Sequence, residues 1–384
     1  MKKKALLVFP GMYINQTSGA KHRLNSFIDA YYEQGYDVSV LAFFKDNPFS
    51  SNRQLDARAK WLLLPALLPT SKNAIFNATE MIYVKLVFAI ITWFTSASVI
   101  QMEMYSVRSR LCNRKKRYIT DVHGDLFHEF VEMGRGDKNH WYAKKLLKMQ
   151  NEVVKYSDRI ICVSDNLKRQ LEINTKMIVS DYRIISCGVD LERYNVNKAT
   201  LPVDLHDRVV VGYSGALQGW QCVEDIIKVT TLLYQKDKRI FLIIYTMDNL
   251  EPYLDLLDKL GKDNYYVCSL KADEVPSHLK LLDAGFLIRD NFVLNKVASP
   301  TKTPEYLAAG AGLICTAYSG DFEKYTKGRG NCYVLDENRF ENIEKLLEWL
   351  YQIKKNKPDN AFLSQFTFQE QFRQSGVFEF NNHE

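Results

Sequence analysis

The sequence predicts an α/β protein with two similar domains, each built on a parallel sheet. Short apolar runs alternate with helical patterns along almost the whole of the 384-residue chain, which is the pattern of βαβ units. A polar stretch that contains a proline interrupts this alternation at residues 195–207. The length also fits two domains of ordinary size better than a single core. We therefore expect one domain over residues 1–198 and a second over residues 199–362.

The apolar runs predict the strands in order. In the first domain we expect them at residues 4–9, 37–43, 61–64, 99–103, 118–122, 159–163 and 182–186. In the second domain we expect them at residues 209–213, 240–245, 265–270, 285–288, 313–316 and 333–335. Ligands of such sheets bind beyond the carboxyl ends of the strands, and two facing domains form a cleft there.

Two helices are marked by apolar side chains at intervals of three and four residues. The first follows the first strand, where Gly35 ends a helix whose apolar positions are Leu24, Phe27, Ile28 and Tyr31. The second is the run 340–353, the last strong helix of the second domain. We expect the remaining segment, residues 363–384, to return toward the first domain.

The composition is that of a globular protein in a reducing environment. Hydrophobic residues make up 46% and charged residues 25% of the chain, so it can bury a sizeable core. The seven cysteines are scattered singly and odd in number, which argues against a disulfide framework and for a cytoplasmic location. The net charge of +6 is compatible with an anionic ligand or membrane surface. Because the basic residues are dispersed, we do not expect nucleic-acid binding.

The apolar stretch at residues 82–100 is the candidate for membrane contact. Lys85 and several hydroxyl side chains interrupt it, and its last residues are typical of a strand. A membrane span needs about 20 clean apolar residues, so we expect a buried helix. The alternative is a helix lying on the membrane, assisted by the basic residues between 108 and 117, which would place the protein peripherally at the inner face.

The segment from Ser299 to Gly310 contains the strongest functional signal. Thr303 can cap a helix whose first turn begins with Pro304, and the free N–H groups there would favour a phosphate. Lys302 adds a full positive charge beside this helix start. Glu305 can accept hydrogen bonds from a vicinal diol such as a ribose. A plain capped helix, packed on the sheet, fits the same residues equally well.

This segment resembles the signature of the large retaining glycosyltransferase group 1 family, whose GT-B fold has two Rossmann-like domains facing across a cleft. Residues 157–164 and 184–190 resemble the end of that family's first domain, and residues 211–215 resemble the donor loop of its second. The resemblance implies a hexosyltransferase whose substrate is a nucleotide-sugar donor, with no separate cofactor. The residues that it assigns to the donor are Gly19, Gly215, Ser299, Thr301, Lys302, Thr303 and Glu305.

Two of the expected contacts belong to the first domain. Gly19 lies on the loop after the first strand, where a glycine lets the backbone approach a ligand, although a plain turn fits as well. His123 follows the strand 118–122, and an imidazole there can hydrogen-bond a sugar hydroxyl or stabilise charge. The family often has a histidine here, close to the transferred sugar; a histidine that only caps the loop is the alternative. The expected catalytic residues are thus His123, Lys302 and Glu305.

Metal binding is not expected. His123, Asp125 and Glu129 lie close together in sequence, but their spacing is not diagnostic of a metal site. Enzymes with the family's fold generally need no metal.

The sequence departs from the family's pattern at the donor. The Arg and Lys that usually follow the donor-loop glycine are missing from residues 216–221. The diphosphate must then be held by backbone N–H groups near Gly215, by Lys302 or by Arg289. Val297 stands where the family has a second glutamate, so the transferred sugar must be recognised differently or by Asn295, Lys296 or Ser299.

The resemblance implies retention of anomeric configuration. The chain has no obvious paired carboxylates for a double displacement, so we expect front-side attack with the leaving diphosphate stabilised by Lys302. The acceptors that we consider are a glycan, a lipid-linked glycan, a protein and a small molecule, and cell-surface polysaccharide or glycoconjugate synthesis is the setting suggested by analogy. The alternatives are a nucleotide-sugar epimerase or phosphorylase of the same fold and a non-catalytic nucleotide-sugar-binding scaffold.

Overall fold

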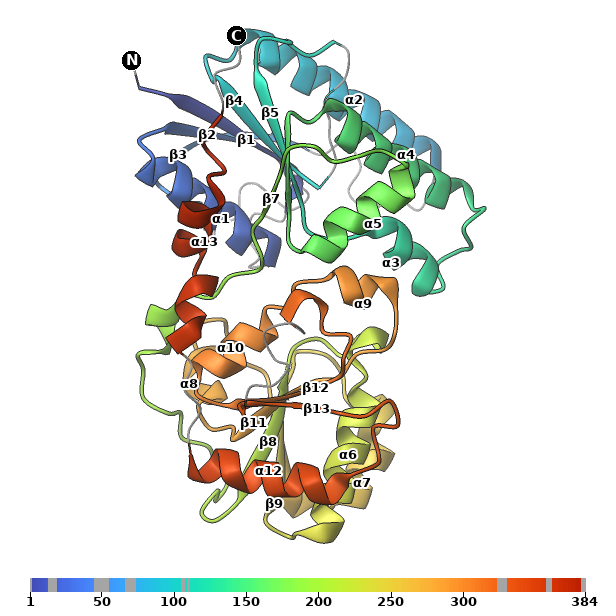
Figure 1. Cartoon of the computed structure of the whole chain (residues 1–384), viewed down its shortest axis with the longest axis vertical. Coiled ribbons are helices and arrows are strands. Elements are labelled where there is room, and N and C mark those ends of the chain that lie inside the picture. The colour runs from blue at the N-terminus through green and yellow to red at the C-terminus, as the bar shows by residue number, and fades with distance from the viewer. Residues whose placement is uncertain are drawn as a thin grey trace. The chain divides into compact units, whose positions relative to one another are not determined.

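The computed structural model describes residues 2–12, 19–44, 55–65, 74–104, 108, 111–322, 330–356 and 361–380. The chain forms two compact units, Met1–Ile185 with Phe372–Glu384 and Ser186–Gln371. Each unit is a parallel sheet with helices on both faces (Figure 1). The predicted fold class, two α/β domains built on parallel sheets, is confirmed.

The sheet of the first unit has seven parallel strands in the order β3-β2-β1-β4-β5-β6-β7. Their order reverses beside β1, which pairs with β2 on one side and with β4 on the other. The strands are β1 (Lys4–Met12), β2 (Asp37–Phe44), β3 (Ala59–Pro65), β4 (Val99–Glu103), β5 (Arg117–Val122), β6 (Arg159–Cys162) and β7 (Tyr182–Ile184). The helices are α1 (Gly19–Glu33), α2 (Ala74–Phe94), α3 (Leu126–Glu132), α4 (Trp141–Tyr156) and α5 (Asp165–Thr175).

The sheet of the second unit has six parallel strands in the order β10-β9-β8-β11-β12-β13. Its order reverses beside β8, which pairs with β9 and β11. The strands are β8 (Val209–Ser214), β9 (Ile240–Tyr245), β10 (Tyr265–Cys268), β11 (Ala284–Leu287), β12 (Gly312–Cys315) and β13 (Cys332–Val334). The helices are α6 (Val223–Lys236), α7 (Leu254–Leu260), α8 (Val275–Leu279), α9 (Val293–Val297), α10 (Lys302–Ala308) and α12 (Ile343–Lys355).

The units divide after Ile185, whereas the sequence places the linker at residues 195–207. The difference has a packing reason. Val189 and Tyr194 are buried in the core of the second unit, and Leu201, Val203 and Leu205 pack against the same core. The polar character of residues 195–207 therefore marks a surface segment of the second unit.

The end of the chain completes the first unit. The last helix, α13 (Phe368–Ser375), contains the division at residue 372. The ring of Phe372 lies 5.0 Å from that of Phe27 on α1, and the ring of Phe378 lies 4.5 Å from that of Tyr31. Arg159 Nη1 donates to the carbonyl oxygen of Val377 at 2.7 Å. Aromatic packing and this hydrogen bond thus attach the terminal segment to α1 and β6.

The apolar stretch at residues 82–100 contains the end of α2 and the start of β4, which begins at Val99. Across the described ranges, no helix combines the length and the apolar character that a membrane crossing requires. Val84, Phe88 and Ala89 of α2 are buried against the sheet, as expected for a core helix. Other apolar side chains of the same helix are exposed, so only one side of α2 is buried.

Candidate functional site

The candidate residues of each unit gather at the carboxyl ends of strands next to the point where the strand order reverses. In the second unit, Gly215 follows β8 and Arg289 follows its neighbour β11. In the first unit, Glu103 ends β4 and His123 follows β5. This edge is where open parallel sheets bind their ligands, because the loops on either side of the reversal leave a crevice.

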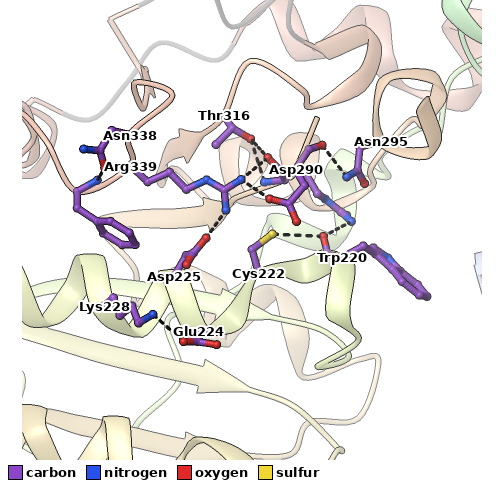
Figure 2. Close-up of polar contacts among 12 residues, drawn as sticks. Trp220, Cys222, Glu224, Asp225, Lys228, Asp290, Asn295, Thr316, Asn338 and Arg339 are labelled. Carbon is purple, nitrogen blue, oxygen red and sulfur yellow. Dashed lines mark hydrogen bonds and ion pairs between the residues drawn. The ribbon is translucent and has the colours of Figure 1, made fainter. Parts of the chain in front are cut away.

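The backbone of Arg289 is held by hydrogen bonds from side chains around it, and Figure 2 labels Thr316 and Arg339, which make them. The N–H of Arg289 donates to Thr316 Oγ1 at 2.9 Å, and the Thr316 hydroxyl donates to the Arg289 carbonyl oxygen at 2.8 Å. Arg339 donates to the same carbonyl at 3.1 Å and to Asp290 Oδ1 at 2.5 Å. Arg339 also pairs with Asp225 on α6. The guanidinium of Arg289 therefore projects from a rigid base.

The side chain of Arg289 is buried with little to neutralise its charge. The residue is 8% exposed, and Nη1 donates to the carbonyl oxygen of Trp220 at 3.3 Å. Burial lowers its pKa from the usual value. Within the described part of the chain, no carboxylate lies within ion-pair distance of this guanidinium. A buried guanidinium with unused donors favours an anionic ligand.

Lys302, the first residue of α10, supplies a second buried cation. Its Nζ donates to Gln221 Oε1 at 3.0 Å and lies 5.2 Å from the centroid of the Tyr213 ring. Burial, together with the charge of Arg289, lowers the pKa of Lys302 to about 7, whereas Glu305 acts to raise it. Arg289 and Lys302 donate to the consecutive residues Trp220 and Gln221, so the two cations lie in one local site.

Gly215 makes room for Lys302. Its φ of +141° is rarely adopted by other residues. A Cβ at this position would lie 2.7 Å from Lys302 Cε and 2.9 Å from Nζ. Any other residue would thus be strained and would push the ammonium group away.

Glu305 lies one turn into α10, close to Lys302. Burial raises the pKa of its carboxyl to about 7, against the lowering effects of Lys302 and Arg193. The adjacent Tyr306 anchors the helix to the sheet: its hydroxyl accepts from the N–H of Ser214 at 2.9 Å, and its ring covers Gly285. The site therefore combines two cations with one carboxyl group on a fixed helix.

The structure corrects the predicted start of this helix. α10 begins at Lys302, and Thr301 occupies the N-cap position without a side-chain hydrogen bond. The prediction that Thr303 caps the helix is wrong, because Thr303 lies inside the first turn. Pro304 is accommodated there because the first N–H groups of a helix have no partner within it. Thr303 is fully buried, and its hydroxyl has no hydrogen-bond partner in the structure.

Ser299 and Gly19 occupy different surroundings. Ser299 Oγ accepts from the N–H of Cys187 at 2.9 Å, so this hydroxyl holds two segments of the second unit together. Gly19 opens α1, and a Cβ built on it would meet no atom within 4 Å. Its neighbours Thr17 and Ser18 lie outside the described residues. Donor contacts by Ser299, Thr301, Thr303 and Gly19 stay predictions.

A buried ionisable cluster surrounds His123 in the first unit. Arg23 of α1 forms a two-point ion pair with Asp121 of β5, with N–O distances of 2.6 and 2.7 Å. Burial opposes ionisation of Asp121, but the charge and hydrogen bonds of Arg23 outweigh it and lower the pKa of this carboxyl. His123 Nδ1 lies 3.9 Å from Asp121 Oδ2, and Nε2 lies 3.6 Å from Glu103 Oε1.

Glu103 differs from Asp121 in its charge state. Burial, reinforced by the charge of Asp121, raises the pKa of Glu103 to about 8. Glu103 is therefore protonated at neutral pH and presents an O–H donor. Next to it is a cavity of about 20 Å³, lined in part by Arg23, Gln101 and Asp121, which has room for a water molecule. His123 Nδ1 and Gln101 Oε1 are buried, and neither has a hydrogen-bond partner in the part of the chain that the structure describes.

Arg23 and Glu103 are functional candidates that only the structure reveals. Arg23 falls on the helix face defined by Leu24, Phe27 and Tyr31, and a charged side chain on a buried face was the available signal. Glu103 is the carboxyl-terminal residue of an apolar strand.

Asp125 and Glu129 have structural partners. Asp125 caps α3 and accepts from the side chains of Gln150 and Asn174. Glu129 pairs with Arg135 at 3.5 Å. Among the residues that the structure describes, no group of three or more His, Cys, Asp or Glu side chains could hold a metal.

Comparisons with known proteins agree with this architecture. Residues 17–193 match the family model described as Glycosyltransferase Family 4. An uncharacterized glycosyltransferase of Methanocaldococcus jannaschii is 21% identical in an alignment of 360 residues that covers 90% of this chain and 88% of that protein. The chain is a glycosyltransferase of the GT-B fold.

Solved structures share the fold over nearly the whole length. Sucrose-phosphate synthase from Thermosynechococcus elongatus aligns with a TM-score of 0.69 at 11% identity, covering 97% of this chain and 94% of that one. HepE from Anabaena, in complex with UDP and glucose, aligns with a TM-score of 0.64 at 14% identity, covering 97% and 98%. TarM of S. aureus, in complex with Fondaparinux, alpha-GlcNAc-glycerol and UDP, aligns with a TM-score of 0.65 at 10% identity, covering 99% and 97%.

Of the two residue clusters in this glycosyltransferase, only the one around His123 lies within the residues that match the family model. His123, Glu103 and Asp121 lie within the matched residues 17–193. Arg289, Lys302 and Glu305 lie outside them, in the second unit. The assignment of the second cluster therefore rests on its own burial and charge.

Proposed function

We propose that this glycosyltransferase moves a hexosyl group from a nucleotide-diphosphate donor to a hydroxyl group of an acceptor. The observation that carries the donor assignment is the pair of buried cations, Arg289 and Lys302. Within the described part of the chain, their side chains donate only to neutral acceptors. A diphosphate would supply the negative charge that this buried pair lacks.

The remaining donor contacts follow from this placement. Glu305, on the same helix as Lys302, would accept hydrogen bonds from the ribose hydroxyls. Gly215 would bring its backbone to the diphosphate, and Ser299, Thr301, Thr303 and Gly19 are the further donor contacts that we propose. HepE and TarM were both solved with UDP, which makes UDP the first nucleotide to test.

The proposed reaction retains the anomeric configuration and uses neither a metal nor a separate cofactor. The bond between the anomeric carbon and the diphosphate oxygen breaks, and its electron pair stays on that oxygen. Arg289 and Lys302 stabilise the charge that develops there. The acceptor oxygen bonds to the anomeric carbon from the same face, and its proton passes to the departing phosphate. His123 would lie near the transferred sugar.

For the acceptor, we propose a class of molecules rather than a single compound. We include glycans, lipid-linked glycans and small molecules with a free hydroxyl group. The setting that we propose is cell-surface polysaccharide or glycoconjugate synthesis in the cytoplasm, by analogy with other enzymes of this fold.

Thermal stability against UDP, GDP, ADP and their sugars tests the donor site. A ligand that binds the folded state raises the melting temperature. We expect one nucleotide to do so for the wild type and to fail for Arg289→Gln and Glu305→Gln. The matched controls are Arg239→Gln and Glu344→Gln, which change exposed residues of the same unit and should leave the shift intact. No shift with any nucleotide would remove the donor assignment.

Turnover separates the transferase from its alternatives. Incubation with the identified nucleotide sugar should release the nucleoside diphosphate only when an acceptor is present. Arg289→Gln should lower kcat/KM by roughly 10²–10³-fold, as for loss of one oxyanion donor. NMR of the product reports its anomeric configuration, and inversion would exclude the proposed front-side step. Acceptor-independent isomerisation would identify an epimerase, and binding without turnover would identify a scaffold.

A further inference from the structure

One face of α2 exposes a continuous row of large apolar side chains. Ile82, Leu86, Ile90, Trp93 and Phe94 are 58%, 47%, 58%, 61% and 85% exposed. Their spacing of three to four residues places them along one side of the helix. The opposite side, with Val84, Phe88 and Thr92, is buried against the sheet. Exposed apolar patches of this extent on soluble proteins usually mark an interaction surface.

A basic segment is fixed at the carboxyl end of this row. Trp93 Nε1 donates to the carbonyl oxygen of Leu111 at 2.8 Å, and the N–H of Asn113 donates to Thr92 Oγ1 at 3.0 Å. Lys116 Nζ donates to the carbonyl oxygen of Thr95 at 2.8 Å. The side chain of Leu111, 61% exposed, extends the apolar row. The basic side chains held there are Arg114, Lys115, Lys116 and Arg117.

The charge of this region is predominantly positive. Residues 82–117 contain seven basic residues and one acidic residue, Glu103, which lies in the buried cluster around His123. Lys4, at the start of β1, lies next to the end of α2, because its Nζ donates to Ser96 Oγ at 3.1 Å. Two carboxylates next to the sheet have basic partners of their own: Asp37 pairs with Lys60, and Asp158, just before β6, lies 3.6 Å from Arg108.

Together, the apolar row and the basic segment fit the surface of an anionic bilayer. Amphipathic helices bind such surfaces by burying an apolar face at the headgroup boundary while lysine and arginine contact anionic lipids. Tryptophan is favoured at this boundary. A second copy of the chain fits less well, because a two-fold contact through this face would bring like-charged segments together.

We infer that the exposed row of α2, extended by Leu111 and by the basic residues 114–117, docks this protein on an anionic lipid bilayer. The inference goes beyond the proposed transfer reaction and does not depend on it. The helix lies on the surface with its apolar row buried among the headgroups, and the basic residues contact lipid phosphates.

Flotation with vesicles tests the docking directly. The wild type should float with vesicles of phosphatidylglycerol and phosphatidylcholine and stay behind with pure phosphatidylcholine. Leu86→Gln/Ile90→Gln removes two exposed apolar side chains, and Arg114→Gln/Lys115→Gln removes two charges. Each double variant should bind the anionic vesicles at least about tenfold more weakly. Thermal melting of each variant shows that it has folded.

The matched control is Ile173→Gln/Ile178→Gln. These two isoleucines of the same unit are 67% and 84% exposed but lie outside the row, so their loss should leave flotation unchanged. Three results would overturn the inference: no flotation of the wild type with anionic vesicles, unchanged flotation of the apolar variant, or equal loss in the control. A dimer that Leu86→Gln/Ile90→Gln dissociates, found without vesicle binding, would instead identify a contact between copies and also overturn it.

Discussion

Lys302 and Glu305 lie one helical turn apart on α10, and burial moves both pKa values to about 7. Above pH 7 the ammonium group therefore loses its proton and Glu305 gains its charge. Both changes remove positive charge from the site where we place the diphosphate. The charge that Lys302 contributes to donor binding is thus present below pH 7 and is lost as the pH rises, whereas Arg289 keeps its charge.

This titration predicts a pH-dependent affinity. Binding of UDP, or of the nucleotide that the thermal panel identifies, should weaken by up to about tenfold for each pH unit above 7 in the wild type. Lys302→Arg should reduce this dependence, because a guanidinium stays protonated and only Glu305 then titrates in this range. Isothermal titration above about pH 7.5, where the nucleotide is already fully ionised, measures it. A slope unchanged by Lys302→Arg would exclude Lys302 as its source.

The raised pKa of Glu103 predicts a pH dependence of folding stability rather than of ligand affinity. Its pKa is about 8 in the folded protein and near 4.5 in the unfolded chain. Between these values the unfolded chain has released a proton that the folded protein keeps, so stability falls as the pH rises. Glu103→Gln removes this loss and should gain on the order of a few kcal/mol over the wild type at about pH 8, but not at about pH 4.5.

Thermal melting at the two pH values measures the effect of Glu103→Gln. The control is Glu33→Gln, which changes an exposed carboxylate of the same unit. An equal gain at both pH values would show that the glutamine repacks the site rather than removing a titration.

At the scale of single elements, α10 contains a testable defect. The Thr303 hydroxyl is buried in its first turn and has no hydrogen-bond partner among the described residues. Because an unpaired buried polar group is costly, the isosteric Thr303→Val should stabilise the second unit by about 1 kcal/mol. Chemical denaturation with and without nucleotide measures this gain. Because we propose Thr303 as a donor contact, the same variant should bind the nucleotide more weakly. A loss of stability without nucleotide would contradict the predicted gain.

The strands could be predicted from the sequence because parallel strands are buried on both faces and appear as continuous apolar runs. β9 was predicted with its observed ends, and β11 was displaced by a single residue. The start of α10 could not be predicted, because Pro304 fits several positions of a first turn. The Arg23–Asp121 pair joins residues 98 positions apart, so only the folded sheet brings them together. Arg289 was one of three candidates for the diphosphate, and its burial next to Lys302 distinguishes it.

At the scale of the whole molecule, the first unit depends on the last residues of the chain. Phe372 and Phe378 pack on α1, and the carbonyl of Val377 accepts from buried Arg159. Truncation after Gln371 should lower the melting temperature of the first unit, since burial of each aromatic ring contributes roughly 2 kcal/mol. The transition of the second unit should stay in place. Calorimetry of the truncated and full chains tests this, and a shift of both transitions together would show that the units unfold as one.

The position of residues 372–384 at the end of the chain has a consequence for synthesis on the ribosome. Residues 186–371, all of the second unit, are translated between the two parts of the first. At about 5–20 residues per second, those 186 residues take about 10–40 s. During that time the nascent first unit lacks the aromatic cover of Phe27 and Tyr31, whereas the second unit is already complete in sequence. The half of the molecule that is made first is therefore the half that is finished last.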